Sequence, residues 1–284
     1  MDSATKPVKD IPSRWRAGWA FGWLASFLSE LGAMTVFGIQ VIIRIPRPPF
    51  EVREFMFQLY QVGVRSIAIV LVAGFFIGGI VALQFNYALN LFGAQVYLGG
   101  MTTSGLLREV GPVLVAIMIT GRIGAYITAE LGTMKVTEQV DAVRCLGADP
   151  LQCLVVPRFL AVVIMIFFLT IFGLIVSLAG GALISSLLLD VNISYYLVNL
   201  RKLTAAWALI NGMIKSVLFG LVIAVVCCYK GMSAEGGAEG VGRAVNSTLV
   251  VASIAVFLLD YVVASLNSLT FRLAESFLFG PISL

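Results

Sequence analysis

Long apolar runs separated by short polar segments dominate the hydrophobic pattern of this chain. No charged residue lies between Arg65 and Arg108, and none lies between Arg158 and Asp190. A helix needs about 20 apolar residues to cross the hydrocarbon core of a bilayer, so each run is long enough for a crossing. The pattern predicts five membrane-spanning helices, at about 64–91, 106–129, 158–190, 203–229 and 244–271.

The segment before the first of these runs carries tryptophans at helical spacing. Trp15, Trp19 and Trp23 recur every four residues, and tryptophan favours the head-group level of a membrane. An amphipathic helix lying in the interface accounts for this spacing, although 14–43 is also long enough to span. We therefore expect an N-terminal tail with an interfacial helix (1–52), a transmembrane domain (53–271) and a C-terminal tail (272–284).

The segments between the predicted spans differ in character. A Gly- and Thr-rich segment at 98–105 predicts an outer turn, and a polar interval at 191–202 predicts a short external helix. A Gly-rich stretch at 230–243 predicts a flexible loop. Small residues spaced as Gly74-xxx-Gly78 in the first span, with glycines 173, 180 and 181 in the third, predict close helix packing.

The composition confines the chain to membrane proteins. Hydrophobic residues make up 60% and charged residues 12% of the sequence, against about 25% charged in soluble domains. Histidine is absent, which excludes imidazole metal ligation and histidine-based catalysis. The chain also lacks the GxxxxGK[ST] phosphate-binding motif. We expect no catalytic residue, no metal and no cofactor in this chain, and any ATP must be hydrolysed by another chain.

The basic residues are distributed unequally across the predicted membrane. Fourteen of the 19 Lys and Arg residues fall in segments on the side of the N-terminus, and four fall on the other side. Cytoplasmic loops are enriched in Lys and Arg. The N-terminus, the segment at 133–146 and the Gly-rich loop are therefore predicted to be cytoplasmic.

Five charged residues fall within or near the predicted spans. Burying a charge costs several kcal/mol unless it is paired or hydrated. These residues either form ion pairs that hold the bundle together, or line a cavity in which cations bind a lipid phosphate and carboxylates position the cations. In the second case Arg108 and Lys215 are the phosphate ligands, Glu109 and Asp260 hold them, and Arg122 pairs with Glu130 or with the cytoplasmic helix.

An apolar stripe follows one face of the first span. Its members recur at helical spacing toward the outer end, beside the start of the second span. On periodicity alone the stripe is ordinary helix or lipid contact; at a dimer interface it would form a pocket for lipid tails. The candidate lipid-binding residues are Val81, Phe85, Ala88, Leu89, Phe92, Leu107 and Val110.

The segment Thr133–Leu146 predicts an amphipathic cytoplasmic helix. Two opposite-charge pairs at i, i+3 stabilise it, Gly147 suits a left-handed stop, and Asp149-Pro150 suits the start of the next helix. The segment is either an amphipathic helix with a solvated polar face, or the coupling helix that docks on an ATPase. Its candidate contacts are Lys135, Glu138, Gln139, Asp141 and Arg144.

Ordered motifs between 105 and 161 carry a family resemblance. They read L-R-E-x-G-P, T-G-R, A-E-L-G-T-M, E-Q-x-D-A, D-P and P-R, and a further match, E-G-V-G-R-A, begins at Glu239. Over roughly 55–267 the chain resembles the MlaE/YrbE family, permease subunits of bacterial ABC transporters that work with MCE-domain proteins. It departs from the family pattern at Thr120, where alanine is usual.

The resemblance implies an all-α, homodimeric permease in the bacterial inner membrane. Its implied partners are a second copy, cytoplasmic ATPases that bind ATP-Mg, a periplasmic MCE-domain protein and phospholipid, with no nucleic acid. Such transporters maintain the lipid asymmetry of the outer membrane. Two alternatives remain open from the residues alone: an ion-coupled secondary transporter in which Glu109 and Asp260 titrate, and a membrane anchor of a periplasmic complex.

Overall fold

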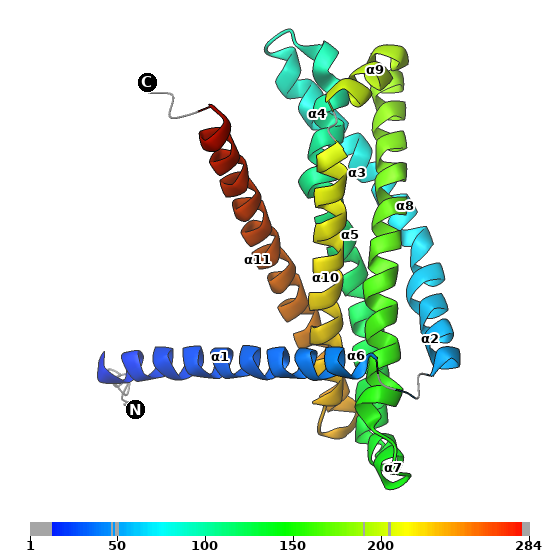
Figure 1. The fold of residues 1–284 in the computed structure, drawn as a ribbon, viewed down its shortest axis with the longest axis vertical. Helices are drawn as coiled ribbons and strands as arrows, with labels where there is room; N and C mark the ends of the chain where they lie inside the picture. Colours follow the sequence, from blue (N-terminus) through cyan, green and yellow to red (C-terminus); the bar gives the residue numbers. More distant parts are fainter. Residues whose placement is uncertain (1–12, 47, 49–50, 190, 204–205, 280–284) are drawn as a thin grey trace, which may run out of the picture.

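The fold is an all-helical bundle with one helix lying across its end (Figure 1). The computed structural model describes residues 13–46, 48, 51–189, 191–203 and 206–279, and this part of the chain contains no strand. Five helical segments are long and apolar enough to cross a membrane, which confirms the predicted class and number of spans. They are Val52–Asn90, Gln95–Val136, Leu151–Leu188, Trp207–Met232 and Gly237–Leu269.

Several spans are assembled from successive α-helical and π-helical pieces. The π-helical segments are Tyr60–Val64, Leu106–Val110, Thr120–Gly124 and Leu151–Val155, and Gln95–Tyr97 is a 3₁₀ turn. The α-helices are α1 (Ser13–Arg44), α2 (Val52–Leu59), α3 (Arg65–Asn90), α4 (Leu98–Gly105), α5 (Gly111–Ile119), α6 (Ala125–Val136), α7 (Gln139–Cys145), α8 (Val156–Leu188), α9 (Ile193–Leu203), α10 (Ala206–Met232) and α11 (Gly237–Phe279).

The first span begins twelve residues earlier than the predicted start at residue 64. The helix already starts at Val52, although this turn is polar, because its polar side chains have partners in the bundle. Glu54 lies 3.2 Å from Arg158 Nη2, and Gln58 is fully buried. Paired charges can therefore extend a membrane helix where hydropathy alone would end it.

The segment at 98–105 was predicted as a turn, and that prediction is wrong. It forms α4, the start of the second span, and the chain reverses earlier, where Gly93 adopts φ +62°. The glycines serve packing instead. A Cβ on Gly99 would lie 2.3 Å from the carbonyl oxygen of Tyr196 in α9, so only glycine allows this approach.

Small residues bring α3 and α8 together, as their spacing predicted. A Cβ on Gly78 would lie 1.8 Å from the carbonyl oxygen of Ser177, and one on Gly180 would lie 2.3 Å from that of Phe75. Backbone contact of this kind is the usual basis of helix association within membranes. The two helices are therefore in direct backbone contact.

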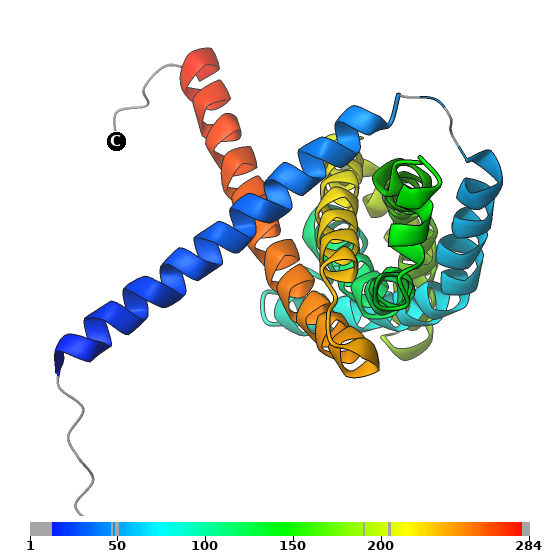
Figure 2. The ribbon, with the colours of Figure 1, turned by 90° about the horizontal axis from the view of Figure 1, so that it is seen from below.

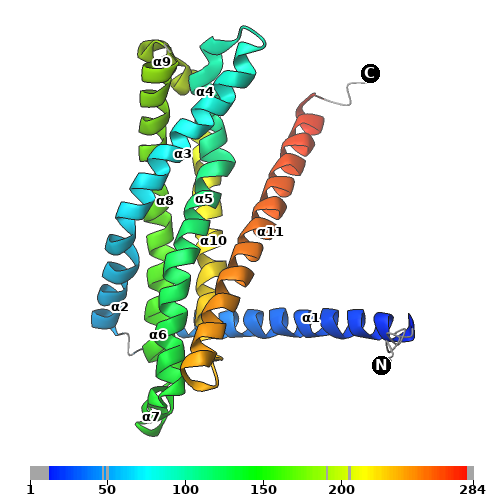
Figure 3. The ribbon, with the colours of Figure 1, turned by 180° about the vertical axis from the view of Figure 1, so that it is seen from behind.

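The loop predicted at 230–243 is shorter than expected. Helix α10 continues to Met232 and α11 begins at Gly237, where Gly236 and Gly237 both have positive φ. Helix α11 continues to Phe279, past residue 271, and leans away from the bundle toward its C-terminal end (Figures 1 and 3). Large apolar side chains on its outer half, such as Phe257 and Tyr261, are exposed.

Helix α1 lies across the end of the bundle and crosses α10 and α11 (Figure 2). Gly38 permits close contact with α10, since a Cβ there would lie 3.0 Å from Val225 Cγ2. At the end of the helix, Arg44 Nε donates to Asp149 Oδ2 at 2.6 Å. This direction, transverse to the spans, is the one an interfacial helix takes; its position in a membrane stays a prediction.

Candidate functional site: a buried ion triad

Three charged side chains from three parts of the bundle meet around Lys215. The Lys215 side chain in α10 is completely buried, and its ammonium donates to Asp260 Oδ1 of α11 at 2.8 Å. It also forms an ion pair with Glu109 of the π-helical segment Leu106–Val110. We call Glu109, Lys215 and Asp260 the ion triad.

Local backbone structure brings Glu109 to Lys215. The π-helical segment ends at Val110, and Pro112, the second residue of α5, supplies no N–H to the helix. Opposite this segment, Gly212 lets α10 approach closely, because a Cβ there would lie 2.3 Å from the carbonyl oxygen of Leu107. Lys215 lies one turn further along α10, within reach of both carboxylates. Single π-turns of this kind are frequent at functional sites.

The ion triad is open on its carboxylate side. The Glu109 side chain is 45% exposed and that of Asp260 is 21% exposed, whereas Lys215 is not exposed at all. Arg108, next in the chain, is exposed and has no ion-pair partner among the residues that the structure describes. The charges of these four side chains therefore sum to zero, and Arg108 is the one of the four outside the ion triad.

Arg122 was predicted to pair with Glu130 or with the cytoplasmic helix, and it forms neither ion pair within the described residues. Its Nη1 donates to Ser66 Oγ. Glu130 instead accepts from Arg158 Nη2 at 2.9 Å, and Glu54 lies 3.2 Å from the same nitrogen. Arg158 outcompetes Arg122 because it lies in the interior between both carboxylates.

This second ion cluster, of Glu54, Glu130 and Arg158, was missed by the sequence analysis. Arg158 was taken only as the edge of an apolar run, yet its side chain is 1% exposed. A cation that follows a proline at the start of a span, with carboxylates in two other spans, was the available signal. The cluster joins α2, α6 and α8 at the end of the bundle that carries α7.

The residues of the apolar stripe differ in burial. Leu89 is buried and Phe85 is half-buried, both packed with Leu98 and Tyr196. The stripe residues Val81 (half-buried), Ala88 (exposed) and Phe92 (83% exposed) lie outside that cluster.

Leu107 and Val110 do not lie in this outer cluster. Leu107 is buried against Leu174 and Ala208, and Val110 is half-buried. The seven stripe residues therefore form no single cluster within one chain. Lipid contact by the stripe stays a prediction.

The segment 133–146 forms two helices where one was expected. Helix α6 ends at Val136, and α7 begins after Glu138, which adopts the left-handed φ of +60°. The predicted i, i+3 ion pair of Lys135 with Glu138 does not form in the described residues, and Lys135 Nζ instead lies 3.4 Å from Asp141. The pair of Asp141 with Arg144, at 3.3 Å, is confirmed.

The stop and restart after α7 were predicted correctly. Gly147 has φ +79°, and Asp149 Oδ1 accepts from the backbone N–H of Leu151 at 3.0 Å. Burial alone would raise the pKa of Asp149, but the hydrogen bond and charge of Arg44 outweigh it and hold the pKa below its usual range. Helix α7 thus projects as a short unit at the end of the bundle, ended at Gly147, and Asp149 caps the segment that follows it (Figure 1).

Comparison with known proteins assigns this architecture to a family. The family model described as "Permease MlaE" matches residues 55–266. The chain belongs to the MlaE permease family. The matched region contains the ion triad, α7, and Glu130 and Arg158 of the second ion cluster, whose third member, Glu54, directly precedes the match. The permease is a multi-pass membrane protein, and its family is one of transport subunits and not of catalytic enzymes.

Named relatives cover most of the permease. A Rickettsia felis protein named "Probable ABC transporter permease protein" is 36% identical over 240 residues, 84% of this chain and 93% of its own length. The Haemophilus influenzae "Intermembrane phospholipid transport system permease protein MlaE" is 34% identical over 74% of this chain and 80% of its own. Arabidopsis "Protein TRIGALACTOSYLDIACYLGLYCEROL 1, chloroplastic" is 34% identical over 80% of this chain and 65% of its own.

Proposed function

We propose that this permease is the membrane subunit of an ABC transporter that moves a glycerophospholipid between the bacterial inner membrane and a periplasmic MCE-domain protein. The name of the Haemophilus relative supports phospholipid as the cargo, and that of the Rickettsia relative supports the ABC type. The observation that carries the proposal is the ion triad, with its free neighbouring cation, inside the membrane domain. A structural ion pair alone would not require that opening.

The lipid phosphate is recognised because it replaces a carboxylate as the ion-pair partner of Lys215. A phosphate binds first to the exposed Arg108, through the paired hydrogen bonds that guanidinium forms. It then competes with Glu109, the more exposed of the two carboxylates, for the ammonium of Lys215. Asp260 stays on Lys215 throughout and keeps this buried cation paired.

The acyl chains contact the outer part of the stripe. Ala88 and Phe92 lie exposed near the outer end of the first span, where a second copy of the chain would cover them. The functional unit is a homodimer, and its two stripes enclose the lipid tails that one chain leaves open. Burial of such tails contributes about 0.8 kcal/mol per methylene to the free energy of lipid binding.

Partner ATPases supply the energy. They bind ATP-Mg in the cytoplasm, and α7, with Glu138, Gln139 and Asp141, is the contact that receives their motion. The N-terminus lies on the same side. Nucleotide binding shifts the dimer between states of different lipid affinity, since a ligand moves an equilibrium only by its differential affinity.

Phospholipid that co-purifies with the reconstituted complex tests this proposal. Arg108→Gln removes the exposed cation next to Glu109 in the chain, and Arg65→Gln removes another exposed arginine, at the start of α3 in the first span. We expect Arg108→Gln to lower both bound phospholipid, measured by mass spectrometry, and lipid transfer, while Arg65→Gln matches wild type. Equal lipid content and transfer in all three proteins would contradict the proposal.

A further inference from the structure

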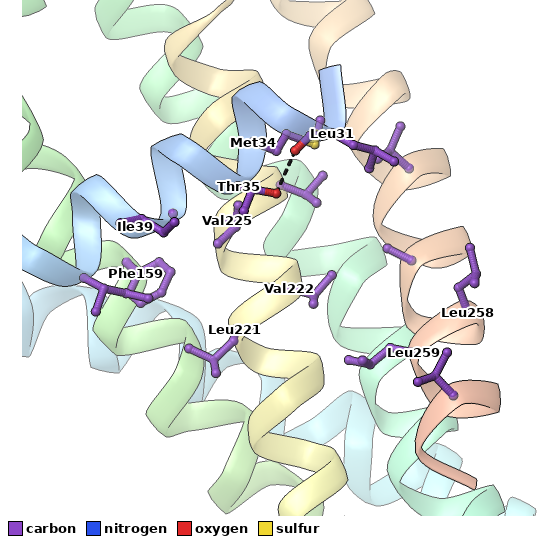
Figure 4. Close-up of a pocket in the computed structure, with 16 residues that line it drawn as sticks. Leu31, Met34, Thr35, Ile39, Phe159, Leu221, Val222, Val225, Leu258 and Leu259 are labelled. Atoms are coloured by element: carbon purple, nitrogen blue, oxygen red, sulfur yellow. Dashed lines mark hydrogen bonds between the residues drawn. The ribbon is translucent and has the colours of Figure 1, made fainter. Parts of the chain in front are cut away.

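An apolar groove that no residue of the ion triad lines lies between α1, α10 and α11 (Figure 4). We call it the α1 groove; its volume is about 530 Å³. Its only hydroxyl, on Thr35, already donates to the carbonyl oxygen of Leu31 at 2.8 Å. The other lining residues have apolar side chains or none, with Met34, Leu221, Val225 and Leu258 prominent in Figure 4. Nothing in the α1 groove can hold a polar ligand.

The α1 groove matches one leaflet of a bilayer in length. Along α11 its lining extends from Val251 to Val262, a rise of about 16 Å at 1.5 Å per residue. The hydrocarbon core of a bilayer is about 30 Å thick, so half of it is about 15 Å. The groove therefore runs from α1 to about mid-bundle, which is the path of one acyl chain.

Charged side chains lie immediately beyond the α1 groove at the α1 end. Glu30 precedes Leu31 of the lining, and Lys230 lies one turn beyond Val226. Together with Glu235 and Arg243 they border a polar pocket of about 370 Å³. Lys230 is 14% exposed and paired with Glu30, which is 42% exposed. Two cations and two carboxylates thus surround one small space.

We propose that the α1 groove binds one glycerophospholipid whose head group carries both a phosphate and an ammonium. An acyl chain fills the apolar part, Lys230 and Arg243 bind the phosphate, and Glu30 and Glu235 bind the ammonium. The lipid belongs to the leaflet on the α7 side, and this clause rests on the membrane orientation in the proposed function.

Such a lipid acts as a structural ligand of α1. This helix contacts α10 closely at Gly38, where a Cβ would lie 3.0 Å from Val225 Cγ2, and the α1 groove opens between it and α11. A bound acyl chain fills that space and joins the helix to both neighbours. The lipid is distinct from cargo because the ion triad plays no part in holding it.

Photocrosslinking tests the apolar part of the site. The complex is reconstituted in vesicles that contain phosphatidylethanolamine with a diazirine in one acyl chain, and adducts are mapped by mass spectrometry. We expect adducts on groove-lining residues of α10 and α11. Ala255→Trp fills the groove and should abolish them, whereas Ile254→Trp, on an adjacent exposed residue outside the lining, should not. Equal labelling of both variants would overturn the proposal.

The polar end is tested separately, with a variant that adds no bulk. Lys230→Gln removes a charged hydrogen bond to the phosphate and should lower labelling roughly tenfold. Phosphatidylglycerol with the same diazirine chain, which lacks the ammonium, should label less than phosphatidylethanolamine, and the matching diacylglycerol least. Equal labelling by the three lipids would overturn the proposal.

The result is independent of the cargo site. Arg108→Gln should leave groove labelling unchanged, even where it abolishes lipid transfer. Loss of groove labelling in Arg108→Gln would show that the groove holds cargo, which overturns the assignment of a structural lipid. Normal labelling in a complex that transfers no lipid would reject the proposed function alone.

Discussion

Replacing Lys215 by methionine removes the central charge of the ion triad and keeps a side chain of similar length. The change leaves Asp260 and Glu109 without their cation, at 21% and 45% exposure. Breaking a fully buried pair costs about 3–5 kcal/mol. Water reaches both carboxylates and reduces that cost, so we expect a loss of about 2–3 kcal/mol. For a chain of this size the melting temperature should fall by roughly 5–10 °C.

The assay is thermal unfolding of the purified permease in detergent, paired with a rescue variant. The triple change Lys215→Met, Glu109→Gln and Asp260→Asn leaves no uncompensated charge. Neutral replacement of a whole ion cluster is often harmless to stability. We expect the triple variant to recover most of the lost melting temperature and to remain unable to bind phospholipid. A Lys215→Met protein that melts like wild type would refute the reasoning, as would a triple variant no more stable than the single one.

Three further predictions concern other parts of the molecule. Gly99→Val should destabilise the outer end by about 1–3 kcal/mol, because the new side chain meets the backbone of Tyr196; a melting temperature equal to wild type would contradict it. Glu138→Lys should reduce ATPase co-purification without changing the melting temperature, since Glu138 is exposed; full co-purification would count against docking at α7. The ion pair of Asp149 with Arg44 should hold α1 on the bundle at pH values above about 3.9. It should release α1 as the pH falls through the lowered pKa of Asp149. Asp149→Asn should remove this pH dependence, which is measured by proteolysis of α1.

Hydropathy predicted the class and the number of spans because charge-free runs can be recognised without tertiary information. The helix stop at Gly147 and the pair of Asp141 with Arg144 depend only on local spacing, and both were predicted correctly. The members of the ion triad were also named from sequence, since an unpaired charge in a membrane is costly. That Lys215 is the buried centre of the triad follows only from packing.

Predictions failed where packing overrides local preference. Glycines such as Gly99 indicate a turn by composition, but in the bundle they allow helices to touch. The partner of Glu130 was misassigned because Arg122 and Arg158 are equally plausible in sequence, and only the fold places Arg158 between two carboxylates. Polar residues in α2 placed the predicted start of the first span too late for the same reason.

Lipid transfer by the reconstituted complex tests the central claim most directly. The permease is placed in vesicles with its ATPase and MCE-domain partners, and transfer of fluorescent phospholipid between vesicle and MCE-domain protein is followed with ATP. We predict transfer that stops when the ATPase carries a substitution that abolishes hydrolysis. Transfer that continues with the inactive ATPase, driven by a proton or sodium gradient, would contradict the account.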